Sequence, residues 1–205
     1  CVEFGHSARQ FIDEVELASL HEQGEDCLSL NVWVRGHARK NLPVMVYIHG
    51  GAYFSGGSAD PLYNGSNFAA AKDVVIVSIN YRLNLFGSLL LDCLPGGEDY
   101  KDAGYLAILD QIRALEWVHE NISAFGGDPN CVTLFGESAG SSSQALLSIL
   151  PEANKYFQRA ILESGPIQLY KTRERGEYFA REFAEIMGCK TAQELLAKSA
   201  DELIE

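Results

Sequence analysis

The stretch 131–150, CVTLFGESAGSSSQALLSIL, decides the fold, because it reads as a strand, a tight turn and a helix. Residues 132–135 are a short β-rich run, 136–138 form the turn, and 139–150 have helical character. The turn carries the pattern Gly136-Glu137-Ser138-Ala139-Gly140, in which small residues let a serine hydroxyl stand exposed between strand and helix. The pattern alone is weak, since about 0.14 chance matches are expected in a chain of this composition. Its position between a strand and a helix favours a functional serine over an inert glycine-rich turn.

Strands and helices alternate on both sides of this stretch. Further strands are predicted at 28–34, 44–48, 74–80 and 159–163, and helices at 68–72, at 105–123 and from residue 173 onward. The runs 44–48 and 74–80 are almost continuously apolar, which is typical of strands covered on both faces. The alternation predicts an α/β fold with a mostly parallel sheet flanked by helices.

Two of the predicted helices carry an apolar face. On the helix 105–123, apolar residues step by three or four positions: Leu106, Leu109, Ile112, Leu115, Val118 and Ile122. On the helix after residue 173, one face gathers Tyr178, Phe179, Phe183, Ile186 and Met187. This spacing is typical of amphipathic helices.

A second small-residue turn, His49-Gly50-Gly51-Ala52, follows the predicted strand 44–48 directly. Such residues let backbone N–H groups approach a ligand oxygen, and loops of this kind supply oxyanion donors in lipases and esterases. A plain turn between strand and loop is the alternative. The presence of both motifs, each after its own strand, favours the oxyanion interpretation.

A serine nucleophile needs a general base, and the histidines do not provide one at the expected place. All five of them precede Ser138: His6, His21, His37, His49 and His119. In α/β-hydrolases the order along the chain is serine, acid, histidine. We therefore expect His49 to be structural and His119 to lie on a helix surface.

Composition narrows the function classes. The net charge of −12 argues against a nucleic-acid partner, and 47% hydrophobic with 21% charged residues is ordinary for a globular protein. The apolar runs are strand-length, far short of a membrane span. Five cysteines without a Cys-x-x-Cys pair give no support for a metal site, and we expect no cofactor.

Taken together, these residues resemble the type-B carboxylesterase/cholinesterase family of α/β-hydrolases. The matching stretches occur in family order at 25–32, 43–56, 80–83, 109–111, 117–118, 125–140 and 163–165. The resemblance implies a serine esterase that forms an acyl-enzyme intermediate on small-molecule carboxylic esters, with Ser138 as the nucleophile.

The same resemblance assigns roles to the residues around Ser138. The backbone N–H groups of Gly51, Ala52 and Ala139 would form the oxyanion hole. Glu137 resembles a buried family glutamate near the acyl site, and Ser164 a serine of the same hydrogen-bond network. Both are supporting residues, and neither is the acid of the catalytic triad.

Two structural pairs are also implied by the family. Arg82 and Asp110 match a buried ion pair, whereas the residues alone allow two unrelated solvated charges. Cys1 and Cys27 match cysteines that close a disulfide loop beside the active-site entrance. Cys189 matches a family cysteine whose partner is missing here, so we expect it to be unpaired.

The match covers nearly the whole chain but only part of a family member. We expect one incomplete domain, with an acidic loop at 1–27, the sheet and serine turn at 28–170, and a helical segment at 171–205. The first and last strands, the triad acid and the triad histidine would lie outside it, as in a fragment of a bacterial-type carboxylesterase. A non-catalytic cholinesterase-like interaction domain and an inactive acid-rich fragment are the alternatives. Oligomeric state and compartment stay open, with the bacterial cytoplasm favoured.

Overall fold

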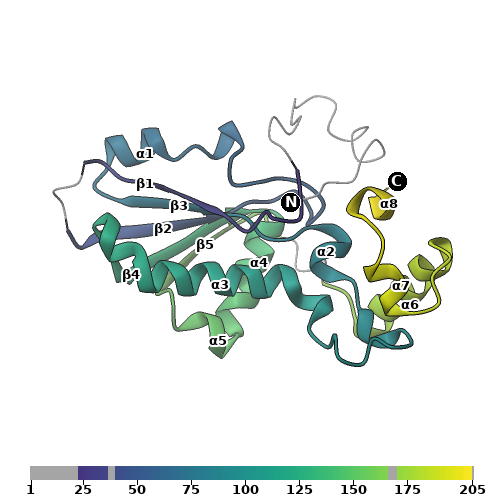
Figure 1. Cartoon of the computed structure of the whole chain (residues 1–205). Helices are drawn as coiled ribbons and strands as arrows, with labels where there is room; N and C mark the ends of the chain where they lie inside the picture. The colour runs from purple at the N-terminus through teal and green to yellow at the C-terminus, as the bar shows by residue number, and fades with distance from the viewer. Residues whose placement is uncertain (1–22, 37–39, 166–169, 205) are drawn as a thin grey trace.

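A five-stranded sheet forms the centre of the molecule (Figure 1). The computed structural model describes residues 23–36, 40–165 and 170–204. The strands are β1 (Leu30–Trp33), β2 (Leu42–Ile48), β3 (Val75–Ile79), β4 (Gly127–Glu137) and β5 (Arg159–Glu163), in the spatial order β1-β3-β2-β4-β5. Strand β1 pairs antiparallel with β3, and the other three pairs are parallel. This arrangement confirms the predicted α/β class and its mostly parallel sheet.

Helices cover the sheet unequally. They are α1 (Ser66–Ala71), α2 (Asn84–Ser88), α3 (Leu106–Asn121), α4 (Ala139–Ile149), α5 (Pro151–Asn154), α6 (Arg173–Ile186), α7 (Ala192–Leu196) and α8 (Ala200–Ile204). Single 3-10 turns are η2 (Pro61–Tyr63), η3 (Leu91–Cys93), η4 (Ala103–Tyr105) and η5 (Ile122–Phe125). Figure 1 shows the short α1 on one side of the sheet, and α3, α4 and α5 on the other. Helices α6 to α8 lie beyond the end of the sheet.

The main core lies between the sheet and the long helices. Val44, Val46 and Ile48 of β2 are fully buried in one cluster with Leu115 and Val118 of α3. Strand β3 is buried along its whole length, as predicted for a strand covered on both faces. The same prediction is wrong for β2, where alternate residues are only half-buried, because the short α1 contacts mainly β3.

The apolar positions of α3 and α6 are only partly buried. On α3, Leu109 is exposed, while the polar Asp110 and Gln111 are buried because both have hydrogen-bond partners. On α6, the buried residues are Ala180 and Ala184, whereas Tyr178, Phe179 and Ile186 are exposed. Alanine lets the helix pack closely on the cluster around η3, which leaves the large side chains outside.

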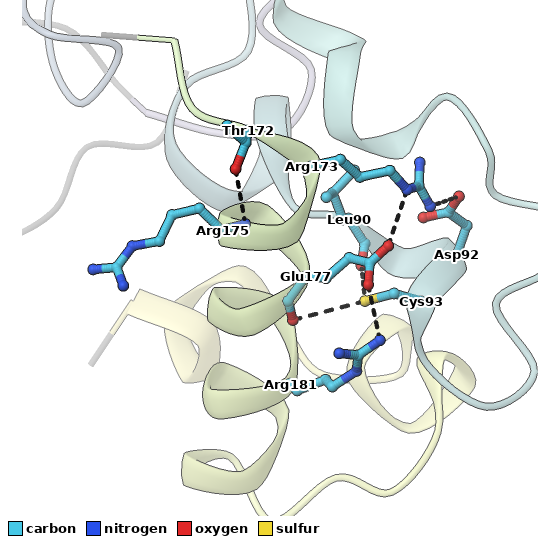
Figure 2. A network of polar contacts seen from close by, with 8 residues as sticks. All are labelled: Leu90, Asp92, Cys93, Thr172, Arg173, Arg175, Glu177 and Arg181. Atoms are coloured by element: carbon cyan, nitrogen blue, oxygen red, sulfur yellow. Dashed lines mark hydrogen bonds and ion pairs between the residues drawn. The ribbon is translucent and has the colours of Figure 1, made fainter. Parts of the chain in front are cut away.

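Ion pairs connect α6 to η3 (Figure 2). The guanidinium of Arg173 reaches Asp92 at 2.7 Å and Glu177 at 2.9 Å, and Arg181 binds the other oxygen of Glu177 at 3.0 Å. The hydroxyl of Thr172 accepts the N–H of Arg175 and caps the helix. Arg173 therefore joins the first turn of α6 to a segment about eighty residues earlier in the chain.

Arg82 and Asp110 form the predicted pair between the segment after β3 and helix α3. Arg82 Nε donates to Asp110 Oδ2 at 2.7 Å, and Nη2 donates to Oδ1 at 2.6 Å. The side chain of Asp110 is only 5% exposed, but that of Arg82 is 31% exposed. The expectation of a buried pair is therefore confirmed for Asp110 and wrong for Arg82, because the arginine lines a cavity of about 300 Å³ beside α2.

Of the two cysteine predictions, only the one for Cys189 falls within the described residues. Cys1 lies outside the described residues, so the predicted bridge to Cys27 does too. Cys189 is buried and has no disulfide within the described part of the chain, as predicted. No helix among the described residues is long and apolar enough to cross a membrane.

Candidate active site

The two sequence motifs meet where the sheet changes its winding direction. Strands β2 and β4 are neighbours, but the chain leaves β2 towards β3 on one side and β4 towards β5 on the other. Loops that diverge in this way open a crevice at the carboxyl ends of the strands, where α/β proteins bind ligands. The loop 49–57 follows β2, and the turn with Ser138 follows β4.

Ser138 has a strained backbone. Its φ of 53° and ψ of −119° are rarely adopted by a residue with a Cβ, at a cost of order 1–3 kcal/mol. Its N–H donates to the carbonyl of Glu163 at the end of β5 (2.9 Å), and its carbonyl accepts the N–H of Ser142 in α4 (3.0 Å). The turn is therefore fixed from the next strand and from the helix that it starts.

The glycines on either side of Ser138 are required by one backbone carbonyl. A Cβ on Gly136 would lie 2.3 Å from the carbonyl oxygen of Ile48, and a Cβ on Gly140 only 2.0 Å from the same atom. A Cβ on Gly50 would lie 3.2 Å from the Cβ of Ser138. The end of β2 and the serine turn are therefore in direct contact, with no room for side chains between them.

The loop after β2 presents unused N–H groups. Gly51, Ala52 and Tyr53 all have positive φ, at 102°, 54° and 64°. Phe54 and Ser55 donate to the carbonyl of Gly51 at 2.8 and 3.0 Å and close the turn. In the part of the chain that the structure describes, the N–H groups of Gly51 and Ala52 have no acceptor, and neither has that of Ala139 at the start of α4. These are the three groups predicted as oxyanion donors.

His49 is buried in a way that suits a structural residue. Its Nδ1 lies 2.8 Å from the carbonyl of Gly50, and its ring stacks on Tyr81 with centroids 4.4 Å apart. Burial lowers the pKa of His49 to about 4, so the ring is neutral at pH 7. Neither His49 nor the exposed His119 is hydrogen-bonded to Ser138, and these are the histidines in the described ranges.

The supporting residues differ from their predicted state. Glu137 and Ser164 are both exposed, so the expectation of a buried glutamate is wrong in this structure. The side chains of the neighbouring strand β5 are mostly exposed as well. Among the described residues, Ser164 makes no hydrogen bond to Glu137. Ser164 has a φ of 52°, a second strained position at this end of the sheet.

A network of hydroxyl groups beneath the serine turn was not predicted. The phenol oxygen of Tyr53 lies 3.1 Å from the carbonyl of Ala139, 2.8 Å from Ser143 Oγ and 3.2 Å from the phenol of Tyr170. Gln111 Nε2 donates to the same Ser143 Oγ at 3.1 Å. The nearest signal in the sequence is a tyrosine directly after the His-Gly-Gly-Ala motif, which by itself does not indicate a partner.

Comparison with known proteins agrees with this geometry. The model of the carboxylesterase family matches residues 1–205. The chain is 47% identical to the para-nitrobenzyl esterase of Bacillus subtilis (strain 168) over 90% of its length, and 42% identical to the liver carboxylesterase of Sus scrofa over a similar share. It superimposes on the carboxylesterase EST55 of Geobacillus stearothermophilus with a TM-score of 0.86 and 44% identity, over 91% of its length.

The comparisons also show how much of each relative is matched. The chain spans 38% of the Bacillus esterase, 33% of the liver enzyme and 40% of the Geobacillus structure. The family match, the identities and the serine turn at the carboxyl end of β4 all support the same assignment. The chain belongs to the carboxylesterase family.

Proposed function

We propose that the protein containing this chain hydrolyses carboxylic esters and that Ser138 is the nucleophile. The observation that carries the proposal is the strained Ser138 at the carboxyl end of β4, next to a loop in which the N–H groups of Gly51 and Ala52 have no acceptor among the described residues. Strain of this kind persists only where the surrounding structure imposes it, and it is concentrated at functional sites.

The proposed reaction has two steps. Ser138 Oγ bonds to the acyl carbon while a base takes the hydroxyl proton, and the carbonyl oxygen becomes an oxyanion. The N–H groups of Gly51, Ala52 and Ala139 stabilise that oxyanion, and the alcohol leaves with a proton returned by the base. Water then attacks the acyl-enzyme by the same route, which releases the acid and restores the serine.

The base in this proposal comes from outside the described residues. His49 is buried and bonded to Gly50, and His119 is exposed on α3, so neither can take the proton of Ser138 in this geometry. The relatives extend well beyond the matched part, and we place the triad histidine and acid there. On this basis the 205-residue chain alone does not turn over esters.

The proposed substrates are small-molecule carboxylic esters. The names of the relatives, a para-nitrobenzyl esterase and a liver carboxylesterase, support this class. The net charge of −12 adds no reason to expect a nucleic-acid substrate.

The test compares Ser138→Ala with a matched serine variant in the complete gene product that contains residues 1–205. Ser148→Ala is the control, because Ser148 lies on the same helix and its hydroxyl donates to the carbonyl of Gln144 within that helix. We expect Ser138→Ala to abolish hydrolysis of p-nitrophenyl butyrate and labelling by a fluorophosphonate probe, and Ser148→Ala to retain both. A wild-type protein that neither turns over esters nor reacts with the probe would instead favour the non-catalytic interaction domain.

A further inference from the structure

We propose that Tyr53 is the positioning residue of the oxyanion hole, because its phenol joins the loop that carries Gly51 and Ala52 to the helix that carries Ala139. The inference rests on the proposed function and adds a residue to it. Tyr53 touches no reacting atom and acts through the backbone on either side.

The loop that carries Ala52 is strained. Ala52 and Tyr53 are consecutive residues with a Cβ, and both have a left-handed φ, of 54° and 64°. Each such residue costs of order 1 kcal/mol or more. Without an anchor the pair would relax, and the direction of the Ala52 N–H would change. The loop must therefore be held by contacts close to these two residues.

Tyr53 provides those contacts through its backbone, its ring and its phenol. Its carbonyl accepts the N–H of Asn84 at 2.8 Å. Its ring packs edge-on against Tyr81, with centroids 6.2 Å apart. Its phenol reaches the carbonyl of Ala139, 86 positions later in the chain, at 3.1 Å. Tyr53 thus fixes both its own backbone and the distance between the two halves of the oxyanion hole.

The hydrogen bonds that link Gln111 to Ala139 all run in one direction. Gln111 Nε2 donates to Ser143 Oγ, which leaves the Ser143 proton for the phenol oxygen of Tyr53. The phenol in turn donates its own proton to the carbonyl of Ala139. Burial raises the pKa of Tyr53, so the phenol keeps that proton at neutral pH. The chain from Gln111 to Ala139 is therefore consistently oriented, with one donor for each acceptor.

The consequence for catalysis is geometric. The N–H groups of Ala52 and Ala139 must both point at an oxyanion that exists only in the transition state, at about 2.7–3.1 Å. A misplacement of about 1 Å can cost on the order of a hundredfold in rate. Loss of the phenol should therefore lower kcat more than it raises KM.

The experiment is Tyr53→Phe in the complete gene product, because this change removes only the hydroxyl. We expect kcat for p-nitrophenyl butyrate to fall about tenfold to a hundredfold with KM within about twofold. Inhibition by a trifluoromethyl ketone, which mimics the tetrahedral intermediate, should weaken by the same factor as kcat/KM. Tyr156→Phe is the control, since that phenol lies at 3.4 Å from Glu116, away from the crevice.

A second readout does not depend on turnover. The N–H groups of Phe54 and Ser55 close the turn on Gly51, so their hydrogen exchange reports on the loop. We expect both amides to exchange faster in Tyr53→Phe. The double variant Tyr53→Phe/Ser143→Ala should change the free energy of this exchange by less than the sum of the two single changes, because both remove the same hydrogen-bond network. Unchanged exchange and an unchanged kcat would overturn the inference, even if Ser138→Ala confirms the esterase. If Ser138 proves inert, the proposed function fails, and the exchange data alone decide whether Tyr53 holds the loop.

Discussion

Asp110→Asn tests whether the ion pair between α3 and the segment after β3 stabilises the fold. The carboxylate accepts three hydrogen bonds from Arg82: from the backbone N–H at 3.0 Å, from Nε at 2.7 Å and from Nη2 at 2.6 Å. In the variant, the side-chain NH2 of the asparagine would face an N–H of the Arg82 guanidinium, so two donors would oppose each other and one hydrogen bond would be lost. The side chain keeps its size, so the change removes charge and one acceptor with little effect on packing.

The expected loss is about 3 kcal/mol of unfolding free energy. Breaking a fully buried pair costs about 3–5 kcal/mol, but water can reach the 31% exposed Arg82, which places the loss at the low end. In a chain of this size, about 3 kcal/mol lowers the Tm by roughly 6–12 °C. Urea unfolding followed by circular dichroism gives the free energy, and calorimetry gives the Tm.

The matched control is Glu116→Gln, which breaks the exposed pair of Glu116 with Arg113 on the same helix. Exposed pairs of this kind contribute little, so we expect its unfolding midpoint to equal that of the wild type. If Asp110→Asn also unfolds at the wild-type midpoint, the burial of Asp110 and its three hydrogen bonds do not stabilise the fold.

Three other outcomes follow from the structure. Gly140→Ala should destabilise the fold by about 3 kcal/mol or more, because its Cβ would meet the Ile48 carbonyl, whereas Gly24→Ala, with open space around it, should unfold like the wild type. Burial lowers the pKa of His49 from 6.5 to about 4, so between these pH values the unfolded state binds a proton that the folded state does not. The free energy of unfolding should therefore fall by roughly 3 kcal/mol as the pH drops from about 6.5 to 4. An NMR titration of the His49 ring in the folded protein with a midpoint above pH 6 would contradict this. The 205-residue chain should show no Ser138-dependent hydrolysis of p-nitrophenyl butyrate, and turnover near 10 s⁻¹ would mean that a base lies within it.

The sheet and the serine turn could be predicted because their signals are local. The run at 44–48 encodes a strand, and Gly136 and Gly140 encode a tight turn around Ser138, and both elements are present. The bond from Tyr53 to Ala139 could not be predicted, because it depends on how two distant loops approach. The exposure of Glu137 depends on which segments cover the ends of the strands, and the pattern around that residue does not encode them.

The carbonyl of Ile48 limits how this part of the protein can be recombined. Both glycines of the serine turn touch that one backbone atom, so the turn depends on the register of β2 rather than on any side chain in it. A shift of one residue would point the carbonyl to the other side of the strand and separate the turn from the sheet. Chimeras that exchange β2 among relatives should therefore tolerate changes of apolar side chain, but not an insertion or deletion between Leu42 and Ile48. In library design, the length of this strand is the property to hold constant.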